Sequence, residues 1–190
     1  MLTVINIEQT PNPNALKFVV NDSFVPNGSV TYNNPKEAGA DPLGQSLFRI
    51  RGVRSVFYMN DFVTVTKSED VPWDAIVDEA ESVISSTAPV VGVVQFVEAT
   101  CAPVAHAPEF DAMTSDERLA TINRVLDGEI RPALAGDGGG LRVMGLEGHT
   151  LKVRYQGACG SCPTATAGTL RAIEGMLREM VSDKLEVVAE

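Results

Sequence analysis

Two of the three cysteines in the chain, Cys159 and Cys162, form a C-x-x-C pair in the stretch GACGSCPTATAGTL (157–170). The residues beside and between the two cysteines are small, and no charged residue occurs from 156 to 170. Two thiolates at this spacing can bind a metal or exchange a disulfide. We therefore take Cys159 and Cys162 as the candidate site of the chain.

The pair is predicted to lie in a loop between a strand and a helix. The preceding residues HTLKVRY (149–155) alternate between polar and apolar, as a strand does, and Pro163 is typical of the first turn of a helix. Cys162 would then lie at or next to the helix N-cap, where unpaired backbone amides and the helix dipole favour a thiolate. Such a loop suits a ligand that is held by sulfur atoms and backbone amides.

The number of available ligands limits what the pair can hold. Tetrahedral zinc usually takes four protein ligands, and a [2Fe–2S] or [4Fe–4S] cluster commonly takes four cysteines. One chain offers this pair, a distant Cys101, His106 and His149. Two copies related by a two-fold axis supply four cysteines at one interface. We therefore predict a cluster held between two subunits, which would be released when the interface opens, as suits a carrier.

Other chemistries stay open for the cysteine pair. A thiol–disulfide oxidoreductase also places C-x-x-C between a strand and a helix, although only 28 residues follow Cys162 here, fewer than a thioredoxin-like fold needs. A zinc site would need Cys159, Cys162 and distant residues, because the chain has no second close pair. The pair could also be inert.

The remaining residues that could do chemistry are expected to be structural. Cys101 is predicted to be an unreactive linker thiol, and His106 and His149 to be solvated or hydrogen-bonded surface residues. DGGG (137–140) lacks the Lys-Ser/Thr ending of a phosphate-binding loop and is predicted to be a flexible turn. TPNPN (10–14) is interpreted as a rigid turn between strands, although exposed turns can also bind partners.

The composition is that of a globular protein, with 190 residues of which 44% are hydrophobic and 21% charged. Fifteen basic against 25 acidic residues give a net charge of −10, which argues against binding to nucleic acid or to an anionic membrane. No apolar run is long enough to cross a membrane. The start MLTVINIEQT lacks the features of a signal or transit peptide, and the cysteine content is typical of a reducing compartment. We therefore expect a mature cytoplasmic chain.

The fold class is predicted to be α+β, with two small domains. Residues 1–85 are expected to have the order ββαββα, with a polar loop after the strand at 16–21 and with Asp41 as the cap of the first helix. Residues 114–190 are expected to have the order αββαβ. The apolar face of its first helix is predicted to carry Leu119, Ile122, Leu126 and Ile130, and that of its last helix Leu170, Ile173, Leu177 and Met180. Residues 86–113, which hold three acidic and no basic residues, are predicted to be a linker. Thr114 and Glu117 form a capping box at the start of the second domain, and Pro132 is expected to bend its first helix.

Both predicted domains resemble parts of Nfu-type iron–sulfur cluster scaffold and carrier proteins. Residues 120–182, with IRPALAGDGGG and YQGACGSCPTATAGTLRAIEGMLREM, are similar to the NifU-like C-terminal domain. Residues 8–74, with EQTPNPNALKF, DPLGQSLFRIRGVRSVFYMNDFVTVTK and VPW, resemble the N-terminal domain that accompanies it. The chain departs from the family where D-G-G-D is common, because Gly140 replaces the second acid.

The resemblance implies that the chain assembles a cluster and delivers it to client apo-proteins. It also implies that the cluster is more often [4Fe–4S] than [2Fe–2S], and that Cys159 and Cys162 are the ligands. We expect no enzymatic turnover, because the sequence has no base–nucleophile pair and no substrate motif. The N-terminal domain would be an adaptor for clients or for an upstream assembly scaffold.

Overall fold

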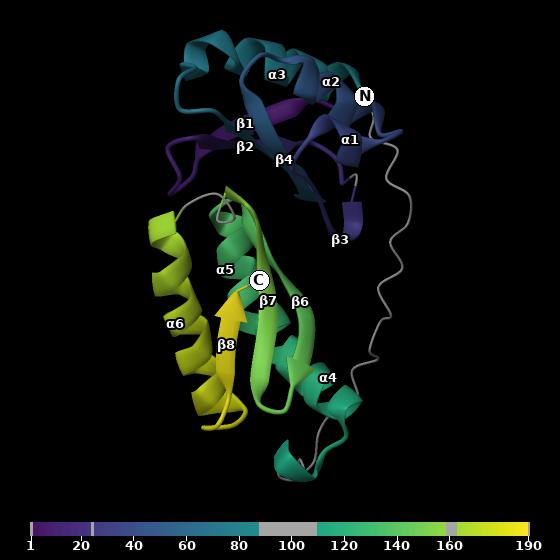
Figure 1. Ribbon diagram of the computed structural model, residues 1–190. Helices are drawn as coiled ribbons and strands as arrows, with labels where there is room; N and C mark the ends of the chain where they lie inside the picture. Colours follow the sequence, from purple (N-terminus) through teal and green to yellow (C-terminus); the bar gives the residue numbers. More distant parts are fainter. Residues whose placement is uncertain (1, 24, 88–109, 159–162, 190) are drawn as a thin grey trace.

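The computed structural model describes residues 2–23, 25–87, 110–158 and 163–189. They form two small α+β units, each with its own hydrophobic core, which confirms the predicted fold class. The N-terminal sheet lies between its own helices and the second unit (Figure 1). No helix in the described parts of the chain is long and apolar enough to cross a membrane.

The N-terminal unit is built on a five-stranded antiparallel sheet with the strand order β1-β2-β5-β4-β3. The four strands that we predicted are all present. The strands are β1 (Val4–Gln9), β2 (Ala15–Val20), β3 (Val25–Tyr32), β4 (Val53–Asn60) and β5 (Phe62–Lys67).

Strand β3 was missed, because we interpreted its residues as a polar loop. Its sequence VPNGSVTY contains Pro26 and Gly28, which are rare inside central strands. The strand lies at the edge of the sheet, and its register against β4 shifts between Val25 and Ser29. A short helix α1 (Pro35–Ala38), capped by the side chain of Asn34, follows it. The order ββαββα was therefore incomplete by one strand and one helical turn.

The two expected helices are present, and they cover one face of this sheet (Figure 1). Helix α2 (Pro42–Arg49) begins after Asp41, whose side chain accepts a hydrogen bond from the Leu43 amide at 3.1 Å. Helix α3 (Val77–Ser86) follows a single 3-10 turn, η1 (Trp73–Ala75). Five apolar residues from this layer are fully buried against the sheet: Leu43, Leu47, Ile76, Ala80 and Ile84.

The second unit has the predicted order αββαβ. Its first helical stretch is interrupted by a π-turn just before Pro132, where we expected a bend. Strands β6 and β7 pair antiparallel, and β8 pairs parallel to β7. The elements are η2 (Phe110–Ala112), α4 (Ser115–Val125), η3 (Leu126–Ile130), α5 (Arg131–Gly136), β6 (Gly139–Glu147), β7 (Thr150–Gly157), α6 (Pro163–Met180) and β8 (Glu186–Ala189).

The core of the second unit is formed by facing apolar residues of α4, α6 and the sheet. Ile122 and Leu177 are fully buried there. Met180, which we placed on the buried stripe of α6, is 55% exposed, and Val181 packs on the core instead. Phe110 also packs on this core, although it falls within the stretch that we predicted as linker. The exact domain boundaries stay a prediction.

Candidate functional site

The two candidate cysteines, Cys159 and Cys162, lie outside the described residues, as do Cys101 and His106. Their roles therefore stay predictions. The elements on both sides of the pair are described: β7 ends at Gly157 and α6 begins at Pro163. These are the strand and the helix that we expected to flank the pair.

The backbone just before Cys159 is held by a close contact between two glycines. Gly157 and Gly138 both have positive φ, of 65° and 71°. A Cβ on Gly157 would lie 2.6 Å from the Gly138 carbonyl oxygen, so only glycine fits there. The Ala158 amide donates to that same carbonyl at 3.1 Å, and Ala158 is 1% exposed. The backbone at Gly157 and Ala158, which directly precedes Cys159, is therefore fixed in position.

Side chains of the N-terminal unit form hydrogen bonds to this part of the second unit, across the boundary between the two units. Asn12 Nδ2 donates to the Ala158 carbonyl at 3.0 Å. Thr64 Oγ1 donates to the Gly138 carbonyl at 2.7 Å. Ser29 Oγ donates to Gln156 Oε1 at 2.8 Å. The residue that precedes the cysteine pair is thus in direct contact with the N-terminal unit.

Phe57 of β4 contacts the same part of the second unit. It is 1% exposed, yet it belongs to neither of the two hydrophobic cores. Its ring lies against two glycines of the second unit, so that an added Cβ would come within 2.9 Å of the ring at Gly140 and within 2.8 Å at Gly157. The glycines therefore allow an aromatic ring to approach the backbone of β6 and β7.

The structure corrects part of our prediction for DGGG as a flexible turn, because only Asp137 and Gly138 form a turn. Gly139 and Gly140 are buried residues of strand β6 and pair with Gly157 and Gln156 of β7. A run of glycines carries no periodic pattern from which a strand can be predicted. Its function in the fold is to leave room for the side chains of the other unit.

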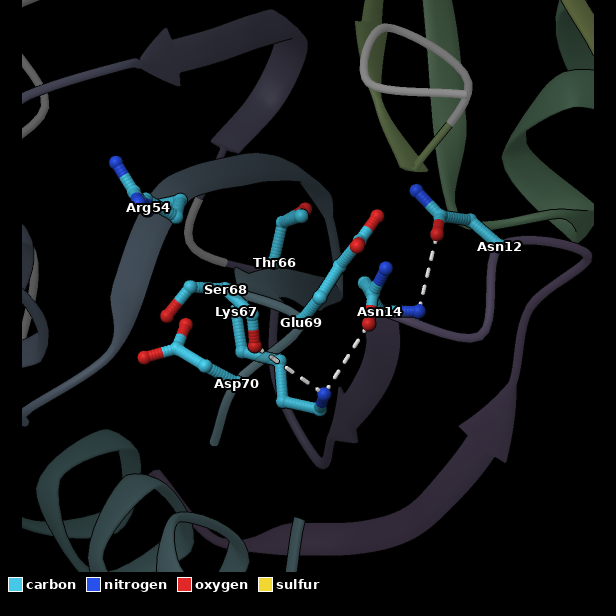
Figure 2. A pocket seen from close by; sticks show the side chains of 8 residues that line it. All are labelled: Asn12, Asn14, Arg54, Thr66, Lys67, Ser68, Glu69 and Asp70. Carbon is cyan, nitrogen blue, oxygen red and sulfur yellow. Dashed lines mark hydrogen bonds between the residues drawn. The ribbon is translucent and has the colours of Figure 1, made fainter. Parts of the chain in front are cut away.

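The TPNPN turn connects β1 and β2, as interpreted, but it also reaches the second unit. Asn12 is only 6% exposed. Its Oδ1 accepts a hydrogen bond from the Asn14 amide at 3.0 Å, and Asn14 Oδ1 accepts one from Lys67 Nζ at 3.1 Å. Figure 2 shows Asn12, Asn14 and Lys67 joined in this series. The turn is therefore fixed from within the N-terminal unit before it meets Ala158.

A pocket of about 500 Å³, lined by polar residues of the N-terminal unit, lies beside this turn (Figure 2). Lys67 lines it and also donates to the Ser68 carbonyl at 3.3 Å. Cationic Arg54 and anionic Glu69 and Asp70 share the pocket. Because both signs of charge are present, the lining selects for no single charge of ligand.

His149 lies at the opposite end of β7 from Gly157. It precedes β7, whereas the pair follows β7, and a strand of eight residues spans about 26 Å. Its Nε2 lies 2.6 Å from Asp111 Oδ1, which agrees with the predicted hydrogen-bonded surface role. Hydrogen bonds from Lys184 and then from His149 lower the pKa of the Asp111 carboxyl from 3.8 to about 2. Within the described ranges, no three His, Cys, Asp or Glu side chains form a metal-binding group.

Two protein families match the two units. Residues 5–89 match the family described as "Scaffold protein Nfu/NifU N terminal", and residues 122–188 match the NifU-like domain. Together the matches include the TPNPN turn, the glycines of β6 and both cysteines of the pair.

Full-length relatives match over nearly the whole chain. "NifU-like protein 5, mitochondrial" of Arabidopsis thaliana is 37% identical over 187 residues, which are 94% of this chain and 65% of that protein. "NFU1 iron-sulfur cluster scaffold homolog, mitochondrial" of Drosophila erecta is 34% identical over 181 residues, 92% of this chain and 60% of that protein. The chain thus spans slightly less than two thirds of the length of these relatives.

Solved structures are similar to one part of the chain. The crystal structure of protein SAV1430 from Staphylococcus aureus is 28% identical and covers 43% of this chain and 96% of its own, with a TM-score of 0.39. A solution structure of a NifU-like protein from Saccharomyces cerevisiae is 31% identical and covers 43% of this chain and 76% of its own, also with a TM-score of 0.39.

The names of the full-length relatives contradict our prediction of a cytoplasmic location, because these relatives are mitochondrial proteins. The prediction rested partly on reduced cysteines, which indicate a reducing compartment but do not identify it as the cytoplasm. The family itself is established by the matches to both units and by the relatives of 34–37% identity. The chain belongs to the Nfu family, with an Nfu N-terminal domain followed by a NifU-like domain.

Proposed function

We propose that the chain is an iron–sulfur cluster scaffold, which binds a cluster through Cys159 and Cys162 and transfers it to apo-proteins. The observation that carries the proposal is the position of this C-x-x-C pair in a NifU-like domain, between β7 and α6. The relatives named iron–sulfur cluster scaffold homologs support the same function. The role is that of a carrier without catalytic turnover.

The cluster is shared between two copies of the chain. Each copy contributes two thiolates, and a four-cysteine cluster needs four. We propose [4Fe–4S] as the cargo in preference to [2Fe–2S]. The partners are then a second copy of the chain, client apo-proteins that accept the cluster, and an upstream scaffold that supplies it.

The residues around the pair contribute in separate ways. Gly157 and Gly138 allow the tight backbone approach that ends β7, and Ala158 is anchored by two hydrogen bonds. The amides of the first turn of α6 have no partners within the helix, so they stabilise a thiolate beside them. These residues position the backbone beside the cysteine pair and favour its thiolate form, but they do not act as metal ligands.

Anaerobic reconstitution with iron and sulfide tests the proposal. We expect the unmodified chain to gain broad visible absorption, and Cys159→Ser and Cys162→Ser to abolish it. Cys101→Ser is the control, because Cys101 is predicted to be an inert thiol, and it should leave the absorption unchanged. Colour that survives loss of both paired cysteines, or a colourless chain that reduces insulin disulfides in a Cys159-dependent way, would refute the proposal.

A further inference from the structure

The face of the N-terminal sheet that points away from α2 and α3 carries hydrogen-bond donors and a buried aromatic ring. Thr64 on β5 is fully buried and Phe57 on β4 is 1% exposed. The helices of their own unit lie on the other face (Figure 1). This face owes its burial to the second unit, and a separate N-terminal domain would expose it.

The surface opposite this face is complementary to it. Gly138, Gly140 and Gly157 have no side chains, so the backbone of the second unit is accessible, with carbonyl oxygens as acceptors. The N-terminal face provides the matching donors, Asn12 Nδ2 and Thr64 Oγ1. We call Gly138, Gly140, Gly157 and Ala158 the glycine surface.

The two donors act at the end of β7 that leads into Cys159. Asn12 binds the carbonyl of Ala158, and Thr64 binds the carbonyl that also accepts the Ala158 amide. The Ala158 peptide is therefore restrained on both sides while the domains are docked. If the domains separate, both side-chain hydrogen bonds to this backbone are lost together.

We propose that the N-terminal domain is a latch on the cysteine loop, with the glycine surface as its docking site. Docking fixes the backbone at Ala158 and so favours retention of the cluster, because a preorganised site loses less conformational entropy when it binds. Undocking releases that backbone and accelerates loss of the cluster. Asn12 and Thr64 are positioning residues in this scheme. Docking itself is independent of the proposed function, whereas its effect on cluster retention rests on it.

Gly140→Ala is the variant that tests the latch. Its Cβ would lie 2.9 Å from the Phe57 ring, and Gly140 does not have the positive φ that would strain an alanine. Gly145→Ala is the matched control on the same strand, because nothing lies within 4 Å of its added Cβ. In a double variant, Phe57→Leu removes the ring atoms that meet the alanine and should restore docking.

The first readout uses the full-length chain without metal. We expect the Asn12 side-chain amide, which donates across the boundary, to show a protected NMR signal that exchanges at least about tenfold faster in Gly140→Ala than in Gly145→Ala. The double variant should return toward the unmodified rate. Equal exchange in the two single variants would overturn the docking proposal. Fast exchange that Phe57→Leu does not reverse would overturn it too, because the alanine would then act within its own domain.

The second readout uses the reconstituted chain and the loss of visible absorption to excess EDTA. We expect Gly140→Ala to lose its cluster several-fold faster than Gly145→Ala. Equal rates, with docking lost by the first readout, would overturn the latch. A failure of all variants to gain a cluster would instead refute the proposed function, while the exchange data would still decide whether the domains dock.

Discussion

Thr64 and Thr66 provide a matched pair of substitutions that measures the contact between the two units. Both lie on β5, where alternation places their side chains on the same face, and both are buried, at 0% and 4% exposed. Thr64 Oγ1 donates to the Gly138 carbonyl at 2.7 Å. Thr66 Oγ1 has no hydrogen-bond partner among the described residues. Valine has nearly the same shape as threonine, so each substitution removes little more than the hydroxyl.

The two substitutions should have opposite effects on stability. Thr64→Val removes a buried neutral hydrogen bond, which is worth about 0.5–1.5 kcal/mol net. The loss should be near 1 kcal/mol, because the Gly138 carbonyl keeps its hydrogen bond from the Ala158 amide and is not left unsatisfied. Thr66→Val removes a hydroxyl that was desolvated without compensation, so we expect a change between zero and about 1 kcal/mol of stabilisation.

Urea unfolding of the metal-free chain at pH 7 measures this difference. Trp73 is the single tryptophan of the sequence, and it lies in the N-terminal unit, so its fluorescence follows unfolding of that unit. We expect Thr64→Val to lower the free energy of unfolding by about 1–2 kcal/mol relative to Thr66→Val. Equal effects of the two substitutions would show that the Thr64 hydrogen bond to Gly138 adds nothing to stability, and would refute the reasoning.

Two further predictions concern the second unit. Leu177→Ala, at a fully buried site in the core, should lower the free energy of unfolding by about 2–5 kcal/mol, as measured by urea unfolding followed by circular dichroism. Met180→Ala, on the exposed face of the same helix, should change it by no more than about 0.5 kcal/mol. Equal changes would contradict the observed packing of α6. Hydrogen bonds from Lys184 and His149 lower the pKa of Asp111 to about 2, so the stability gained from its ionised carboxylate is present above pH 3.8 and is lost as the pH falls toward 2. Asp111→Asn should therefore reduce the pH dependence of stability between pH 4 and 2, measured by acid titration of the thermal midpoint, and an unchanged profile would refute this assignment.

Local sequence signals were sufficient for most elements of the fold. Asp41 before Pro42, and the Thr114–Glu117 capping box, correctly marked helix starts. The spacing of apolar residues on α4 and α6 identified most of the buried positions. Strand β3 was missed because Pro26 and Gly28 interrupt its pattern, and an edge strand tolerates both. Met180 was misplaced because the stripe continued past the point where the helix leaves the core.

The candidate site was only partly accessible from sequence. The alternation of residues 149–155 and the presence of Pro163 correctly predicted the strand before the cysteine pair and the helix after it. The contacts of Asn12 with Ala158 and of Thr64 with Gly138 join residues separated by 146 and 74 positions. No periodicity in the sequence encodes contacts at such separations. The close approach of Phe57 to Gly140 is likewise a property of the two units together.

Native mass spectrometry of the freshly reconstituted chain, with iron and sulfide analysis of the same sample, tests the sharing of a cluster most directly. The account predicts two chains and one cluster in each coloured particle, and a return to single chains when the cluster is removed. A single chain that carries a complete cluster would contradict it.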